Sequence, residues 1–194
     1  MAFKTEDFKD LPAVLSKKEL RQYTEKKDGV LDIYVNRWLK QGVLRKAGER
    51  CGMYYNISKD PAWQNHVLEA VAKKFPSAML AGPSVLHATG LQTQIPGSFH
   101  VVVLERRSFP DMDMVTFMPR NRTWFAENIP EHTYFGMRSL SPSQALKDGL
   151  MHQHIQGSWV PDLDDIELDE ELEGFDVEKY AEKRVKTKKK TWSV

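Results

Sequence analysis

The clearest hydrophobic periodicity in the chain lies between residues 30 and 42. Four apolar residues recur there at helical spacing: Leu31, Val35, Trp38 and Leu39. Residues with this spacing share one side of an α-helix. Gly42 follows them, at a position where a helix C-terminus commonly adopts a positive φ. The pattern predicts an amphipathic helix that buries this stripe and ends near Gly42.

A shorter helix is predicted immediately before it. Ser16 precedes Lys17-Lys18-Glu19, so Ser16 and Glu19 can form a capping box, in which each side chain accepts a hydrogen bond from the other residue's backbone amide. We expect this helix to cover about residues 17–23. Asp28-Gly29 is typical of a turn, so the chain is expected to reverse there before the second helix.

After Gly42 the helical spacing ends. Residues 43–46 and 53–57 are short runs that favour β-strands, and the sequence between them, Ala-Gly-Glu-Arg-Cys-Gly, places Arg50 at the tip of a turn. A basic hairpin is therefore expected. The order of helix, turn, helix and hairpin is typical of a winged helix-turn-helix domain, which we assign to residues 1–60.

Residues 61–160 predict a second domain that mixes helices and strands. Residues 100–104 contain three consecutive valines, which favours a strand buried on both faces. The fold class is therefore α+β: an N-terminal winged helix-turn-helix followed by a small α+β domain with a mainly antiparallel sheet. The expected elements are helices near 65–75 (ended by Pro76), 84–90 and 141–150, and strands near 100–104, 114–118 and 133–138.

Composition supports a folded chain. Hydrophobic residues make up 41% of the 194 residues, which is enough for a packed core. The single cysteine, Cys51, excludes an intramolecular disulfide and a multi-cysteine zinc site, and it fits a reducing compartment, so we expect a cytoplasmic protein. The sequence contains neither an apolar run of the roughly 18 residues that a membrane span needs nor the apolar core of a signal peptide.

The net charge of +1 hides an uneven distribution. Residues 1–60 carry a net charge of +4, residues 61–150 carry +1, residues 151–180 carry −9 and residues 181–194 carry +5. We expect residues 161–194 to form a charged tail that is first acidic and then basic. Part of the basic excess lies in the predicted winged helix, where it is compatible with a nucleic-acid partner.

The predicted winged helix supplies candidate DNA contacts. The second helix of such a domain enters the major groove, and its face opposite the apolar stripe carries Ile33, Asn36, Arg37 and Lys40, with Tyr34 on the flank. Asparagine can pair with adenine and arginine with guanine. The hairpin cations Arg45, Lys46 and Arg50 are candidates for phosphate or minor-groove contacts. The first-helix cations Lys17, Lys18 and Arg21 are candidates for contacts with the DNA backbone.

Patterns that could carry catalysis or bind a metal are incomplete. The run Gly82-Pro83-Ser84-Val85-Leu86 lacks the second glycine of a nucleophile elbow. His152 and His154 lack a third metal ligand with suitable spacing. We therefore expect no metal, no cofactor and no catalytic residue here.

One alternative stays open. Gly97-Ser98 together with Asp111 and Asp113 is similar to the triphosphate-binding and Mg²⁺-binding elements of a nucleotidyltransferase. Such a site needs a helix between the two elements, whereas the residues after Ser98 favour a strand, and Pro110 directly precedes the first carboxylate. A non-enzymatic protein is the favoured interpretation, with a Mg²⁺-dependent nucleotidyltransferase as the alternative.

Three stretches together resemble the AbiEi-type antitoxins of type IV toxin–antitoxin systems. They are the predicted winged helix, whose hairpin ends in Tyr54-Tyr55, the segment HVLEAVAKKFPSAMLAGPSVLHATGLQTQIP, and the junction MRSLSPSQALKDGL. The middle segment is the most specific of the three. The resemblance covers roughly residues 10–165 of the sequence.

The resemblance implies a transcriptional repressor of its own operon, with a role in phage defence. Its first domain would bind inverted repeats in double-stranded operator DNA, and its second domain would counter a nucleotidyltransferase-like toxin, directly or indirectly. It supplies no catalytic residues. The short C-terminal region and the charged tail depart from the family pattern, so a stand-alone regulator or a protein-interaction module built on a winged helix remains an alternative.

Overall fold

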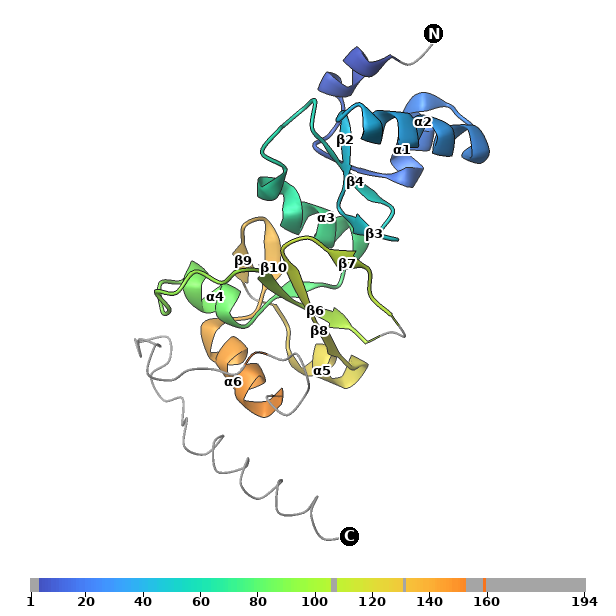
Figure 1. Cartoon of the computed structure of the whole chain (residues 1–194). Helices are drawn as coiled ribbons and strands as arrows, with labels where there is room; N and C mark the ends of the chain where they lie inside the picture. The colour runs from blue at the N-terminus through green and yellow to red at the C-terminus, as the bar shows by residue number, and fades with distance from the viewer. Residues whose placement is uncertain (1–3, 106–107, 131, 153–158, 160–194) are drawn as a thin grey trace, which may run out of the picture. The chain divides into compact units, whose positions relative to one another are not determined.

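The computed structural model has a mixed α+β architecture (Figure 1), so the α+β class expected from the sequence is confirmed. No helix among the residues described is both long and apolar enough to cross a membrane. The expected charged tail, residues 161–194, lies outside the described part of the chain. The structure describes residues 4–105, 108–130, 132–152 and 159.

The chain divides into two compact units. Of the described residues, the first unit contains 4–77 and 108–115, and the second contains 78–105, 116–130, 132–152 and 159. The boundary that we expected after residue 60 therefore lies after residue 77 in the structure. Residues 108–115, which follow a strand of the second unit in the sequence, belong to the first unit.

The first unit combines helices with a three-stranded antiparallel sheet of order β1-β4-β2. A separate two-stranded ladder pairs β3 with β7. The helical elements are η1 (Thr5–Asp10), α1 (Lys17–Thr24), α2 (Asp28–Lys40), η2 (Trp63–His66) and α3 (Val67–Lys74). The strands are β1 (Val14–Ser16), β2 (Leu44–Lys46), β3 (Gly48–Glu49), β4 (Met53–Asn56) and β7 (Asp111–Met112).

The capping box predicted for α1 is present. The Glu19 backbone amide donates to Ser16 Oγ over 3.1 Å, and the Ser16 amide donates to Glu19 Oε2 over 2.7 Å. The turn predicted at Asp28-Gly29 is wrong, because both residues belong to the first turn of α2. An aspartate is stabilised there by the helix dipole. The chain reverses earlier, where Glu25 ends α1 in the left-handed conformation with φ of 55°.

The predicted apolar stripe of α2 forms the core of the first unit. Leu31, Val35 and Trp38 are buried, and Leu39 packs at the edge of the same cluster. The ring of Phe8, from the unpredicted helix η1, meets Trp38 edge to face at 5.0 Å between centroids. Buried Asn56 ties η1 to the sheet, since its Nδ2 donates to the Phe8 carbonyl over 2.7 Å.

Helix α3 explains why the first unit extends to residue 77. It packs against β1 and β4, and Lys73 Nζ donates to the Val14 carbonyl over 2.7 Å. Its buried residues include Val67, Leu68 and Val71. The helix ends at Phe75, directly before Pro76, as the sequence predicts.

The second unit is built on a five-stranded sheet of order β8-β6-β5-β10-β9. Strand β5 is antiparallel to β6 and parallel to β10, and β9 is antiparallel to β10. The three valines of β6 are buried, as expected. The elements are β5 (Met79–Leu80), α4 (Pro83–Ala88), β6 (Phe99–Leu104), β8 (Val115–Arg120), α5 (Arg122–Glu127), β9 (His132–Tyr134), β10 (Met137–Ser139) and α6 (Pro142–His152).

One expectation for this unit is wrong, and one helix was not predicted. Residues 133–138 do not form one strand, because Phe135 and Gly136 have φ of 51° and 75° and turn the chain between β9 and β10. Positive φ at both central residues is typical of a tight two-residue hairpin turn. Helix α5 was not expected. Its N-cap is Asn121, whose Oδ1 accepts from the Trp124 amide over 2.9 Å.

A buried polar network joins β8, α5 and α6. Arg120 Nε and Nη2 donate to the two carboxylate oxygens of Asp148 over 2.9 and 2.6 Å. Trp124 Nε1 donates to Asp148 Oδ1 over 2.8 Å, and His152 Nδ1 lies 2.9 Å from the same oxygen. Arg120 and Asp148 are each only 4% exposed. The carboxylate is therefore the common acceptor for three elements.

Asp148→Asn is expected to destabilise the protein by about 3 kcal/mol or more, because it leaves the Arg120 charge buried without a counter-ion. Urea denaturation followed by circular dichroism measures the effect. Met151→Ala is the matched control: Met151 lies on the same helix but is 49% exposed, so its loss should change stability by less than about 0.5 kcal/mol. Equal effects of the two substitutions would contradict the role given to the network.

The same network predicts that the free energy of unfolding depends on pH. Burial alone would raise the pKa of Asp148, but hydrogen bonds from His152 and Arg120 hold that pKa below its ordinary value. The unfolded chain, with an aspartate pKa of about 3.9, then takes up the proton first. The stabilisation is therefore present above about pH 4 and is lost as the pH falls through the folded pKa. Asp148→Asn should flatten the fall in unfolding free energy measured between about pH 5 and pH 3.

Candidate nucleic-acid interface

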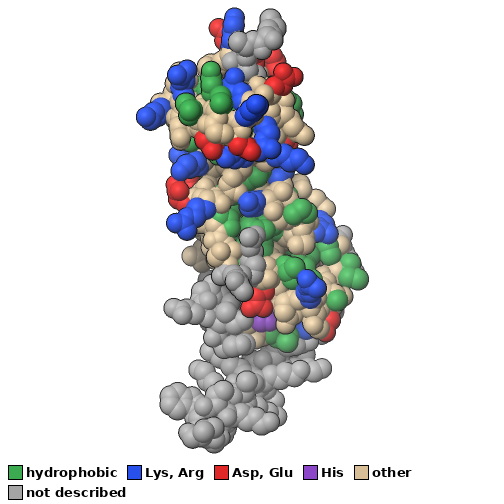
Figure 2. Space-filling view, turned by 90° about the vertical axis from the view of Figure 1, so that its right-hand side faces the viewer, with side chains coloured by type: hydrophobic (Ala, Val, Ile, Leu, Met, Phe, Trp, Pro, Cys, Tyr) green, Lys and Arg blue, Asp and Glu red, His purple; other side chains and the backbone are tan. Residues whose placement is uncertain are grey.

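The face of α2 opposite its buried stripe is open to solvent. Ile33 is 64% exposed, and Asn36, Arg37 and Lys40 are exposed beside it, while Tyr34 on the flank is half-buried. The structure thus brings together the helix residues that the sequence predicted for DNA contact. In the space-filling view, apolar side chains lie among Lys and Arg side chains over the part of the first unit near the top (Figure 2).

Two residues of α1 that were predicted to contact phosphate, Lys17 and Arg21, form ion pairs with α2. Lys17 Nζ lies 2.6 Å from Asp32 Oδ1. Arg21, one turn later in α1, pairs with Asp28, one turn earlier in α2. The hydrogen bond to Asp32 raises the pKa of Lys17. These two pairs hold the helices side by side and neutralise the acidic residues at their edge. Lys18 is exposed and makes no ion pair within the described part of the chain.

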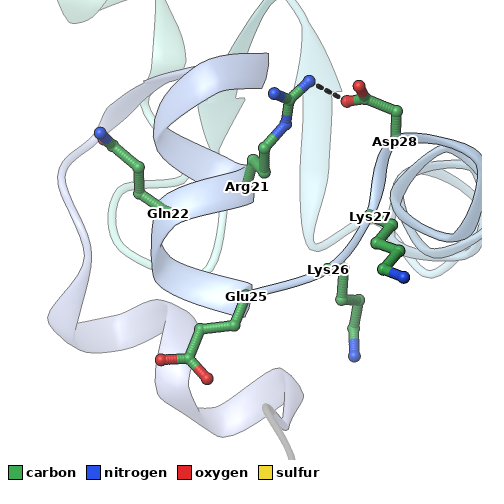
Figure 3. A pocket seen from close by; sticks show the side chains of 6 residues that line it. All are labelled: Arg21, Gln22, Glu25, Lys26, Lys27 and Asp28. Carbon is green, nitrogen blue, oxygen red and sulfur yellow. Dashed lines mark hydrogen bonds and ion pairs between the residues drawn. The ribbon is translucent and has the colours of Figure 1, made fainter.

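The turn between α1 and α2 is hollowed, but its charges are mixed (Figure 3). Arg21 and Asp28 point toward one another across its upper edge. The lining residues are Arg21, Gln22, Glu25, Lys26, Lys27 and Asp28. With both signs of charge along its wall, this hollow does not form a dedicated anion site.

Tyr34 serves as a platform for two cations. Lys26 Nζ lies 4.1 Å from the centre of the Tyr34 ring, and the Arg37 guanidinium carbon lies 5.5 Å from it. A cation over an aromatic face is attracted by the ring's electron density. Tyr34 therefore orients Arg37 on the exposed face. The sequence suggested no such role for it.

Arg45 and Lys46, which the sequence grouped together, lie on opposite faces of the sheet. Neighbouring residues of a strand point to opposite sides. Arg45 Nη2 lies 2.6 Å from Asp113 Oδ2, and its guanidinium carbon lies 4.2 Å above the Trp63 ring. Asp113 and Trp63 thus hold the Arg45 side chain, which is 47% exposed, and its phosphate contact stays a prediction. Lys46 remains exposed, with a 3.2 Å ion pair to Glu49.

The hairpin between β2 and β4 is paired with a distant segment. Gly48 and Glu49 lie opposite Met112 and Asp111 in an antiparallel ladder. A Cβ atom on Gly48 would lie 2.0 Å from the Asp111 carbonyl oxygen, so only glycine allows this approach. Arg50 stays exposed at the tip of the hairpin, with φ of 55°. Two of the three predicted hairpin cations thus remain available for contacts.

Gly29 and Val30 also belong to the exposed face of α2, and the sequence analysis missed them. Val30 is 47% exposed, and a Cβ atom on Gly29 would meet no atom within 4 Å. Gly29 was assigned to the turn, and Val30, although within the predicted helix, was not named among the contact residues. Extending the helical periodicity back to Asp28 would have placed them beside Ile33.

The nucleotidyltransferase alternative gains no support from these contacts. Asp113 is occupied by Arg45, and Ser98 Oγ lies 2.6 Å from Thr116 Oγ1. Gly97-Ser98 belongs to the second unit, whereas Asp111 and Asp113 belong to the first.

The other weak chemical patterns have structural partners. Ser84 Oγ accepts from the His100 amide over 2.8 Å, and His152 lies against Asp148. His154 lies outside the described residues. Among the residues described, no three His, Cys, Asp or Glu side chains are grouped as metal ligands would be.

Comparison with known proteins bears on the fold alone. No family model matches the chain, and no curated protein matches it. Its structure is similar to the crystal structure of the RV2827C protein from Mycobacterium tuberculosis, with a TM-score of 0.60 and 18% sequence identity. The match covers 92% of this chain and 68% of that chain. The α+β arrangement found here therefore occurs in a solved protein of very different sequence.

Gly48→Ala is expected to break the β3–β7 ladder, because its added methyl group would collide with backbone at Asp111. The amides of residues 48–49 and 111–112 should exchange faster with deuterated water, as followed by mass spectrometry. Gly29→Ala is the matched control, since it has open space around it and should leave this exchange unchanged. Unaltered exchange in Gly48→Ala would contradict the pairing.

Proposed function

We propose that the first unit is a winged helix-turn-helix that binds double-stranded DNA. The observation that carries the proposal is the joint exposure of Asn36, Arg37 and Lys40 on the helix that follows a helix and a short turn. The order β1, α1, α2, β2, β4 supports the same interpretation. In this assignment α2 is the recognition helix, and the β2–β4 hairpin is the wing.

The charge distribution favours a compact interface. Asp28 and Asp32 are neutralised by Arg21 and Lys17, so the cations on the open face of α2 dominate the local potential. Positive side chains at such a face attract phosphate and release its counter-ions. The proposed contacting residues are Lys18, Ile33, Asn36, Arg37, Lys40, Lys46 and Arg50, with Tyr34 positioning Arg37.

The biological role follows from the resemblance to AbiEi-type antitoxins. We propose that the protein represses its own operon by binding operator repeats and that it counters a nucleotidyltransferase-like toxin. The segment 66–96 carries this part of the proposal, since it is the most specific of the resembling stretches. Co-expression with the product of the adjacent reading frame tests it: rescue of growth is expected, and unrelieved toxicity would contradict the antitoxin role.

A second candidate is a protein-interaction module built on the same helices. The exposed apolar side chains Val30 and Ile33 favour it, because apolar surface also serves protein partners. A partner recovered in a pull-down, together with no shift of any duplex, would favour this candidate over DNA binding.

The DNA-binding proposal separates three arginines by their effects in a gel-shift assay. Arg37→Ala should weaken binding to the specific duplex by about 1–3 kcal/mol, because Arg37 is placed to read a base. Arg50→Ala should weaken binding across sequences and flatten its salt dependence, because a phosphate contact is lost.

Arg45→Ala is the matched control within the hairpin. Asp113 and Trp63 hold this side chain on the sheet face opposite Lys46, so the affinity for DNA should stay close to that of the wild type. Unchanged affinity in both Arg37→Ala and Arg50→Ala would contradict the proposed recognition face. A loss confined to Arg45→Ala would place the interface on the other side of the sheet.

A further inference from the structure

The exposed face of α2 changes character along the helix. Its N-terminal half presents Gly29, Val30 and Ile33, and its C-terminal half presents Asn36, Arg37 and Lys40. The two apolar side chains are neighbours, because residues three apart share one face of a helix. Ile33 is 64% exposed and Val30 is 47% exposed. The N-terminal half of the exposed face therefore presents apolar side chains to solvent.

The position of these residues restricts what they can contact. In a helix-turn-helix, the N-terminal residues of the recognition helix meet the base edges. The edges in the major groove are polar, except for the C5-methyl group of thymine. We propose that Ile33, supported by Val30, reads thymine methyl groups and makes the protein selective for thymine at one or two positions of its site. This inference rests on the DNA-binding function proposed above.

Gly29 supports the assignment by leaving room for a base pair. It lies one helical turn before Ile33 on the same face, and a Cβ atom placed on it would meet no protein atom within 4 Å. Alanine would fit the protein there and would favour the helix. The missing side chain instead lets the groove approach the backbone next to Ile33.

The surroundings of this apolar pair favour DNA over a protein surface. Val30 and Ile33 are only two side chains, and Arg37 borders them on the same face, whereas stable protein interfaces bury about 800 Å² on each partner. Asp32, the acidic residue that directly precedes Ile33, is paired with Lys17, with 2.6 Å between Lys17 Nζ and Asp32 Oδ1. A small apolar patch bordered by cations complements a thymine methyl group in the major groove, which has phosphates on either side.

The test uses the full-length protein and a pool of random DNA duplexes. Repeated selection gives the enriched duplex, which is then synthesised with uracil in place of each thymine, singly and together. Uracil pairs as thymine does but lacks the C5-methyl group, so the substitution removes only the proposed contact. Binding of the thymine and uracil forms is compared for wild type, Ile33→Ala, Gly29→Ala and Lys18→Ala.

Loss of one contacted methyl group should weaken wild-type binding about four-fold, because the free energy gained by burying one methyl-sized group corresponds to about that change in affinity. Ile33→Ala should bind the thymine duplex about as weakly as the wild type binds the uracil form, with no preference left between the two. Gly29→Ala should fold normally yet bind both forms less tightly. Lys18→Ala is the matched control: it should bind both forms less tightly and keep the thymine preference.

Two results would overturn the inference while DNA binding stands. One is equal wild-type affinity for the thymine and uracil forms. The other is an Ile33→Ala variant that keeps the wild-type preference for thymine. If no duplex is enriched over the starting pool, the proposed function fails and the inference fails with it.

Discussion

Leu31, Val35 and Trp38 of α2 are buried against Phe8 and Leu44, and this packing determines what the rest of the helix can do. A helix that places one stripe in the core must present the opposite stripe to solvent. The exposed stripe is the one that carries the proposed contacts. The exposed ion pairs between α1 and α2 connect the two helices without using the residues of the open face of α2.

The alternation of side chains along β2 places the hairpin cations on different faces of the sheet, because one face must be buried. Leu44 of β2 must face the core, so Arg45 faces the other side, where Asp113 and Trp63 hold it. Lys46 returns to the side of Leu44. The ladder between β3 and β7 restrains the hairpin further. The proposed interface is therefore smaller than the basic residues of the first 60 positions suggest, and it is more sharply defined.

Local chemistry was readable from the sequence, and long-range pairing was not. The capping box at Ser16 and the stripe of α2 depend on residues within a few positions, so spacing alone located them. The Arg45–Asp113 pair joins residues 68 positions apart, and no sequence pattern connected them. The turn at Phe135 was missed because aromatic residues seldom adopt positive φ. The strand alternation at Arg45 was readable in principle, since neighbouring strand residues cannot share a face.

The most direct test of this account is a titration of isotope-labelled protein with duplex DNA from upstream of its gene, followed by nuclear magnetic resonance. The account predicts that the amide signals of residues 29–40, Lys46 and Arg50 shift, whereas those of Trp63 and Asp113 stay in place. Shifts around Trp63 and Asp113 with an undisturbed α2, or no shifts at saturating DNA, would contradict it.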